Sequence, residues 1–61
     1  MNITATVSRD GRFWLVYVPE VNQYTQGRNL AEAREMACDL VATMLDLPIG
    51  DVQLADMVVE A

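Results

Sequence analysis

The sequence predicts an α+β domain of two layers, in which three strands, a helix and a fourth strand follow one another in the order β-β-β-α-β. Three observations predict it. Hydrophobic residues alternate on both sides of an Asp-Gly pair, recur at helical spacing after Asn29, and alternate again near the C-terminus. A chain of 61 residues has the size of one domain, so we expect residues 1–61 to form a single unit with one helix on one face of a small sheet.

The first two predicted strands form a hairpin. Residues 2–8 alternate apolar side chains with hydroxyl or amide side chains, as a half-buried strand does. Asp10 and Gly11 suit the two central positions of a tight turn, and residues 12–18 then form the second strand. With this turn, Val7 lies opposite Trp14. The apolar residues that share one face in this register are the predicted core: Ile3, Ala5, Val7, Trp14, Val16 and Val18.

The second predicted strand is apolar on its other face as well. Phe13, Leu15 and Tyr17 lie on that face, and Tyr24 of the next strand can join them. Because the helix covers only the core side, we expect these four residues to form a face for a partner protein or for self-association. The alternative is that aromatic side chains are simply tolerated on a hydroxyl-rich sheet surface.

The third strand is predicted at residues 21–26, followed by a turn into the helix. Gly27 supplies backbone freedom at this turn. Asn29 suits the N-cap position, and Glu32 stands three residues later, where its carboxylate can accept a hydrogen bond from the cap amide. We therefore expect the helix to begin at Leu30.

The helix is predicted to run from Leu30 to Asp46, where Pro48 ends it. Its apolar arc, which should cover the core side of the sheet, comprises Leu30, Ala33, Met36, Ala37, Leu40, Val41, Met44 and Leu45. Its opposite side carries a predicted acidic ridge of Glu32, Glu35, Asp39 and Asp46. This ridge is either a solvated helix face or a surface for a basic partner.

A turn at residues 48–51 leads to the fourth strand, predicted at residues 52–60. A strand that is reached through a helix should lie parallel to the strand beside it, by a right-handed crossover.

The composition excludes several classes of function. The chain has no histidine and a single cysteine, Cys38, and its carboxylates are scattered, so we expect no catalytic residues, no metal site and no cofactor. A net charge of −5 argues against direct binding of nucleic acid. We also expect no membrane span, and we expect a cytoplasmic location because the cysteine is unpaired and no signal peptide opens the chain.

Several short motifs follow one another between residues 3 and 47: Asp10-Gly11, Trp14, Val16, Val18-Pro19-Glu20, Thr25-Gln26-Gly27, Leu30 and Glu32-Ala33. In this order and spacing they resemble the HicB-like antitoxin domain of bacterial toxin–antitoxin pairs. Many HicB proteins carry a further C-terminal DNA-binding domain, and we expect none in this chain.

The resemblance implies a partial RNase H-like fold and a protein partner. That partner is a HicA-like toxin, a small basic mRNA interferase that the antitoxin masks. The resemblance also implies a homo-oligomer, either a dimer or a tetramer. The alternative function is a stand-alone homo-oligomeric interaction protein, an orphan or phage-borne relative without a toxin.

Overall fold

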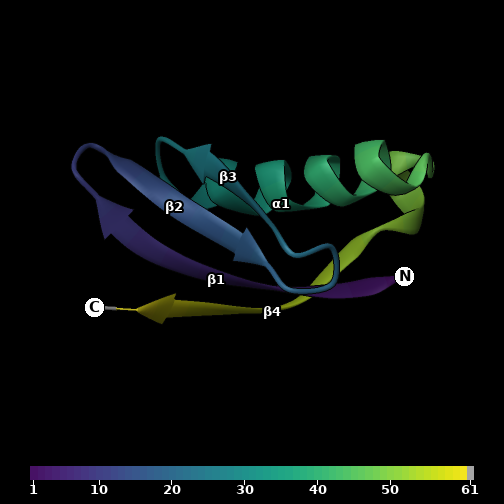
Figure 1. Ribbon diagram of the computed structural model, residues 1–61, viewed down its shortest axis with the longest axis horizontal. Helices are drawn as coiled ribbons and strands as arrows, with labels where there is room; N and C mark the ends of the chain where they lie inside the picture. The colour runs from purple at the N-terminus through teal and green to yellow at the C-terminus, as the bar shows by residue number, and fades with distance from the viewer. Residues whose placement is uncertain (61) are drawn as a thin grey trace.

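A computed structural model describes residues 1–60 and confirms the predicted order of elements. Three strands come first: β1 (Asn2–Asp10), β2 (Phe13–Val18) and β3 (Gln23–Gly27). The helix α1 (Leu30–Leu45) follows, and a short 3-10 turn (Ile49–Asp51) leads to β4 (Gln53–Glu60). The described residues form an α+β domain of two layers, with α1 lying across one face of the sheet (Figure 1).

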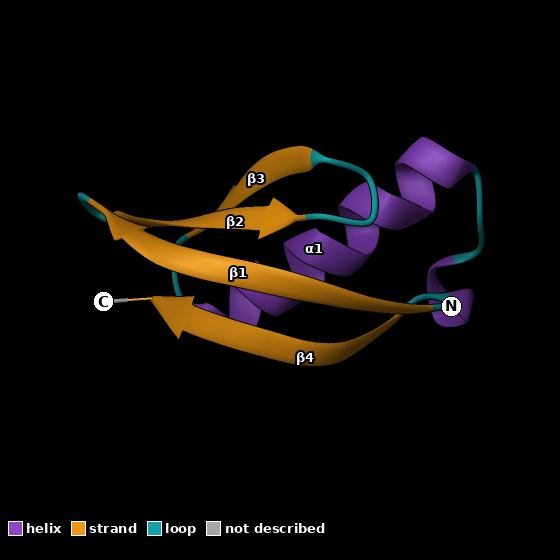
Figure 2. Ribbon diagram, turned by 60° about the horizontal axis from the view of Figure 1, so that its bottom comes forward, coloured by secondary structure: helices purple, strands orange, loops and turns teal. Residues whose placement is uncertain are grey.

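The sheet has four strands in the order β3-β2-β1-β4 (Figure 2). The hairpin strands β1 and β2 pair antiparallel, as do β2 and β3, whereas β1 and β4 pair parallel. This confirms the prediction that the last strand lies parallel to its neighbour. The two edges of the sheet are therefore β3 and β4, and they differ in length and in cover.

The predicted register of the first hairpin is wrong by two residues. Val7 lies opposite Val16 rather than Trp14, and Asp10 lies opposite Phe13. The two loop residues are Gly11 and Arg12, and Gly11 has a φ of 62°. Glycine with positive φ at the first loop position is the pattern of a type II′ turn, which suits the strand twist as well as the predicted turn does. A shift of two residues leaves every side chain on its predicted face.

Five of the six predicted core residues on the hairpin are therefore buried, namely Ile3, Ala5, Val7, Val16 and Val18. Trp14, the sixth, packs against this core but is only partly buried. In the observed register Trp14 lies opposite Arg9, whose guanidinium carbon is 5.3 Å from the centre of the indole ring. A cation over an aromatic face is a favourable contact that keeps part of the ring at the surface.

The helix packs on this core through small side chains. Ala33, Ala37 and Val41 are buried along α1 and belong to the same cluster as the buried strand residues. Their size brings the helix backbone close to β3. A Cβ atom on Gly27 would lie only 2.6 Å from the Ala33 nitrogen. Gly27 is thus the last residue of β3 and leaves room for the helix, which differs from its predicted role in the turn.

Some residues of the predicted apolar arc of α1 do not contact the sheet core and remain exposed. Leu30, Met44 and Leu45 were predicted to face the sheet, but all three side chains are exposed. They lie at the two ends of the helix, whereas the buried residues lie mainly in its central turns. The helix therefore carries uncovered hydrophobic surface at both ends.

The capping prediction is confirmed for one of its two hydrogen bonds. The Asn29 Oδ1 accepts a hydrogen bond of 2.8 Å from the Glu32 backbone N–H. The Glu32 carboxylate accepts one from the Arg28 N–H at 3.3 Å, and not from the Asn29 N–H as predicted. The helix ends one residue before the predicted end. Asp46 adopts a left-handed conformation, and the Leu47 N–H donates to the Ala42 carbonyl at 2.8 Å.

The third strand begins two residues later than predicted. The backbone folds into a turn at residues 18–22, where the Val21 N–H donates to the Val18 carbonyl and the Asn22 N–H donates to the Pro19 carbonyl. Asn22 has a φ of 51°, a left-handed conformation that asparagine tolerates better than most residues. This turn places the Asn22 side chain beside β2.

Candidate interaction surfaces

The four residues of the predicted partner face lie on the side of the sheet away from α1. Phe13, Leu15 and Tyr17 alternate along β2, where they lie opposite Asp10, Ser8 and Thr6 of β1. Tyr24 of β3 lies directly opposite Tyr17. We call Phe13, Leu15, Tyr17 and Tyr24 the aromatic face. No element of residues 1–60 covers this side of the sheet (Figure 2).

Exposure within the aromatic face is uneven. Tyr24 is 61% exposed and Phe13 is 43% exposed, whereas Leu15 and Tyr17 are partly buried by their neighbours in the sheet. The aromatic face thus has two exposed rings, Phe13 and Tyr24, and two less exposed residues, Leu15 and Tyr17. Large exposed rings on an uncovered sheet are typical of a protein-binding surface.

The two tyrosines of this face pack against each other. Their ring centres are 4.7 Å apart and the ring planes are tilted by 43°. The Tyr17 hydroxyl donates a hydrogen bond of 2.8 Å to the Asn22 Oδ1, whereas Tyr24 is 61% exposed. Tyr17 is thus oriented before any partner binds, which lowers the entropy cost of recognition at this residue.

A shallow hollow of about 260 Å³ lies on the same side of the sheet. Its lining combines the apolar rings and Leu15 with hydroxyls and one carboxylate: Thr6, Ser8, Leu15, Tyr17, Tyr24 and Glu60. Such a hollow fits an apolar side chain whose neighbour is basic, because Glu60 is the charged residue among the described residues of the lining.

The four residues of the predicted acidic ridge differ in their surroundings. Glu32 is partly buried and accepts a hydrogen bond from the Arg28 N–H at the start of the helix, whereas Glu35, Asp39 and Asp46 are exposed. Glu35 and Asp39 lie on neighbouring turns of the helix and also border a second surface.

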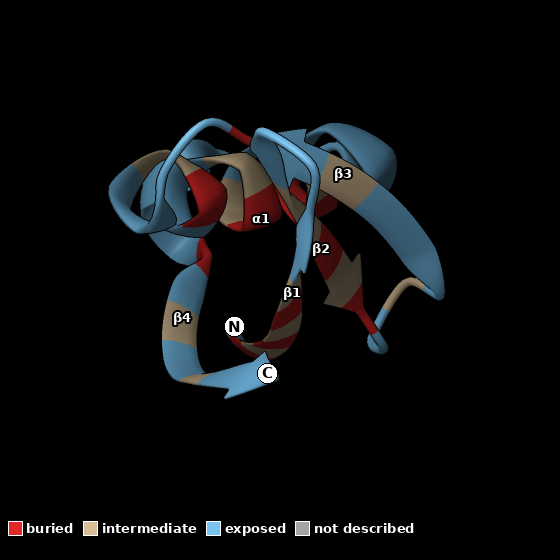
Figure 3. Cartoon of the chain, turned by 90° about the vertical axis from the view of Figure 1, so that its left-hand side faces the viewer, coloured by how far each residue is buried: buried red, intermediate tan, exposed pale blue. Residues whose placement is uncertain are grey.

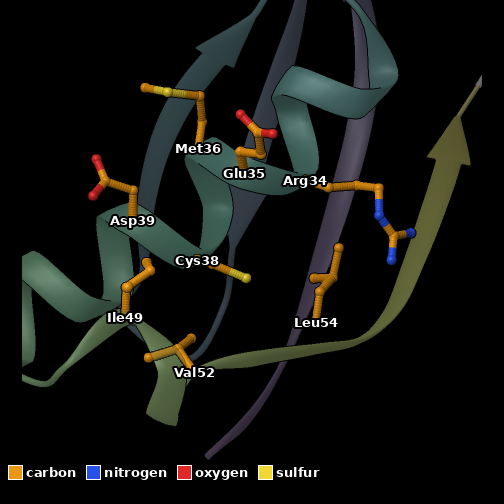
Figure 4. Close-up of a pocket in the computed structure, with 8 residues that line it drawn as sticks. All are labelled: Arg34, Glu35, Met36, Cys38, Asp39, Ile49, Val52 and Leu54. Atoms are coloured by element: carbon orange, nitrogen blue, oxygen red, sulfur yellow. The ribbon is translucent and has the colours of Figure 1, made fainter.

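This second surface is a groove of about 640 Å³ between α1 and β4 (Figure 4). We call it the α1–β4 groove. It is lined by residues of the helix, the 3-10 turn and the start of β4: Arg34, Glu35, Met36, Cys38, Asp39, Ile49, Val52 and Leu54. In Figure 4 the Cys38 thiol and the Leu54 side chain point into the space between helix and strand, and the Arg34 guanidinium reaches toward β4.

Sequence reasoning did not find the groove. Cys38, the single cysteine, is partly buried at this groove. The hydrophobic pattern of the sequence does not determine which strands the helix covers. In the structure, the position of the helix across the sheet leaves β4 partly uncovered. The weak alternation of hydrophobic residues in β4 was the available signal.

A long-range contact between Glu20 and Thr4 holds the turn after β2 against β1. The Glu20 carboxylate accepts hydrogen bonds of 3.0 Å from both the backbone N–H and the hydroxyl of Thr4. Burial acts to raise the pKa of Glu20, but the hydrogen bonds from Thr4 and from its own backbone N–H outweigh it and hold that pKa below its ordinary value of 4.5.

Within residues 1–60, no group of three or more cysteine, aspartate or glutamate residues is placed to hold a metal ion. The helix that these residues form is too short and too polar to cross a membrane.

We compared the chain with models of protein families, with curated proteins and with solved structures, and none of them matches it.

Proposed function

We propose that this chain is an antitoxin-like protein-binding domain that masks a small basic HicA-like mRNA interferase toxin. The observation that carries the proposal is the aromatic face, which has no cover from the described residues and presents Phe13 and Tyr24 to solvent. The order of short motifs that resembles the HicB-like family supports the choice of partner.

Charge supports the same partner. A toxin that cleaves mRNA needs a basic surface for the phosphates, and this chain carries a net charge of −5. Glu60 lies in the hollow of the aromatic face, and it would meet a basic residue beside an inserted apolar side chain. Binding on this face would cover the toxin surface that RNA needs.

The proposal has three further parts. The chain acts as a homo-oligomer, a dimer or a tetramer, in the cytoplasm. It binds its toxin without a cofactor and without contacting nucleic acid directly. It has no enzymatic activity of its own, so the effect on RNA cleavage comes from occupying the toxin.

Co-expression with a HicA-like toxin from an adjacent reading frame tests the proposal. We expect the chain to restore growth and to co-purify with the toxin. Tyr24→Lys should reduce co-purification at least tenfold, because it removes an exposed ring and places a positive charge against a basic partner. Gln23→Lys is the matched control, since it adds the same charge to the neighbouring exposed residue, which lies on the other side of the sheet.

Absence of growth rescue and of co-purification would reject the antitoxin function. In that case the exposed apolar surface of the sheet would favour the second candidate, a stand-alone homo-oligomeric interaction protein. A genome neighbourhood without a small basic toxin points to the same alternative.

A further inference from the structure

The outer edge of β4 is a long free strand edge. Among the described residues, β4 has eight residues and pairs with β1 alone, so its other side presents unpaired backbone N–H and C=O groups. Natural proteins protect such edges with proline, charged side chains, bulges or short length. β4 has no proline or lysine, and its protection is limited to Asp56, Glu60 and one irregularity in its pairing with β1 beside Ile3 and Thr4. Val58 and Val59 are each 50% exposed on it. The opposite edge, β3, has five residues, and the helix packs against it through Gly27.

The cover of β4 is incomplete on the helix side as well. No residue of β4 is fully buried, and Leu54 and Met57 are only partly buried beneath the helix layer (Figure 3). The α1–β4 groove runs along this part of the strand. An extended segment that paired with this edge would form backbone hydrogen bonds with β4 and apolar contacts with the β4 side chains. The surface therefore suits a partner in the form of an added strand.

We propose that the occupant is β4 of a second copy, paired antiparallel across a two-fold axis. The two four-stranded sheets then become one continuous sheet. This deepens the self-association part of the proposed function and rests on it. A domain of 61 residues buries too little surface to be very stable alone, and self-association is a common remedy.

The charges along β4 exclude two registers, and the length of the paired segment favours one of the rest. Pairing with β1 places Asp56, Val58 and Glu60 on the side of the aromatic face, and Met57 and Val59 on the helix side. A two-fold axis at Asp56 would oppose two aspartates, and one at Val58 would oppose Asp56 to Glu60 twice. An axis at Met57 opposes Asp56 to Val58, so no like charges face each other, and it pairs residues 54–60 of the strand. Axes at Ala55 and Val59 also keep like charges apart, but they pair only residues 53–57 and 58–60.

This arrangement has a consequence for the partner. Both aromatic faces lie on one side of the continuous sheet and both helices lie on the other, so a dimer presents two copies of the partner face side by side. The backbone edge of β4 and the rings of the aromatic face are then different surfaces, and Glu60 is the residue that they share, because it belongs to β4 and also lines the hollow of the aromatic face.

Charge variants of Val58, studied by sedimentation equilibrium, test the register. Val58→Asp places a carboxylate opposite Asp56 of the second copy on both sides of the axis, and the dimer dissociation constant should rise at least tenfold. Val58→Lys places an ammonium group there, and the dissociation constant should stay equal or fall. Gln23→Asp and Gln23→Lys make the same charge changes on the β3 edge and should have a much smaller effect.

Crosslinking locates the axis independently of charge. In a Cys38→Ser background, Met57→Cys should form an intermolecular disulfide faster than Val58→Cys, because Met57 lies opposite itself and Val58 does not. A faster disulfide at Val58 would overturn the register. A chain that stays monomeric at all concentrations, or one in which the Gln23 and Val58 variants behave alike, would overturn the proposed edge.

The two proposals fail in different ways. A monomer that binds the HicA-like toxin would reject the β4 pairing and keep the antitoxin function. A dimer that crosslinks at Met57 and binds no such toxin would reject the antitoxin function and keep the pairing.

Discussion

The hairpin strands and β4 differ in how far α1 covers them, although β1, β2 and β4 all carry hydrophobic residues on the helix side of the sheet. The hairpin strands β1 and β2 contribute five buried side chains to the core beneath α1, including Ile3, Val7 and Val16. β4 contributes none. The difference teaches that burial in this domain depends on where the helix lies, and that hydrophobic residues on the helix side of a strand form a core only where α1 covers them.

The largest effect on stability is expected from truncating Ile3, and Leu54, its neighbour on β4, gives the comparison. Ile3 and Leu54 are register partners on β1 and β4, but Ile3 is fully buried and Leu54 only partly. Ile3→Ala should reduce the free energy of unfolding by about 2–5 kcal/mol. Leu54→Ala should cost roughly half of that or less, because part of its side chain is already in water. Urea denaturation measures both, and equal losses would mean that β4 is as well covered as β1.

The contact between the helix and β3 gives the next effect. Gly27→Ala places a Cβ atom against the Ala33 backbone, which must move, and we expect a loss of about 1–3 kcal/mol in the free energy of unfolding. Gly50→Ala is the matched control, since a Cβ there meets nothing within 4 Å. It should be neutral or slightly stabilising. If both variants behave alike in thermal unfolding, the close approach of α1 to β3 is not a constraint on this fold.

The smallest effect concerns pH and the Glu20 contact with Thr4. The folded pKa of Glu20 lies below 4.5, so its ionised carboxylate stabilises the fold above that value. This contribution is lost as the pH falls through the folded pKa. The midpoint of thermal unfolding should therefore be higher for the natural chain than for Glu20→Gln at neutral pH, and the two should converge on acidification below 4.5.

The control for this prediction is Glu35→Gln, which removes the same charge from an exposed position on α1. A Glu20→Gln variant whose deficit stays constant from neutral to acidic pH would show that the hydrogen bonds to Thr4 do not depend on ionisation. The measurement is a set of thermal unfolding curves across the pH range.

The order of elements, the helix cap and the division of the hairpin into two faces could be predicted from the sequence. Each follows from short-range information: alternation, the 3.6-residue period, and Asn29 followed by Glu32. The register of the hairpin could not, because Asp10, Gly11 and Arg12 fit two different two-residue turns. Both turns place each side chain on the same face of the sheet, so the hydrophobic pattern does not distinguish them.

Contacts between residues far apart in the sequence could not be predicted from the hydrophobic pattern. The partners of Trp14 and Glu20 depend on the true register and on the path of the turn after Val18. The α1–β4 groove depends on the sideways position of the helix, which follows from the close approach of Ala33 to Gly27. The aromatic face was found because it lies within two neighbouring strands, where alternation alone places its side chains together.

The most direct test of the partner-binding account is a titration of the 15N-labelled chain with the HicA-like toxin, followed by NMR chemical shifts. The account predicts that the amide signals of β2 and β3 around Leu15, Tyr17 and Tyr24 shift most, while those on the outer face of α1, such as Ala31 and Thr43, stay in place. Shifts confined to α1, or no shifts at saturating toxin, would contradict it.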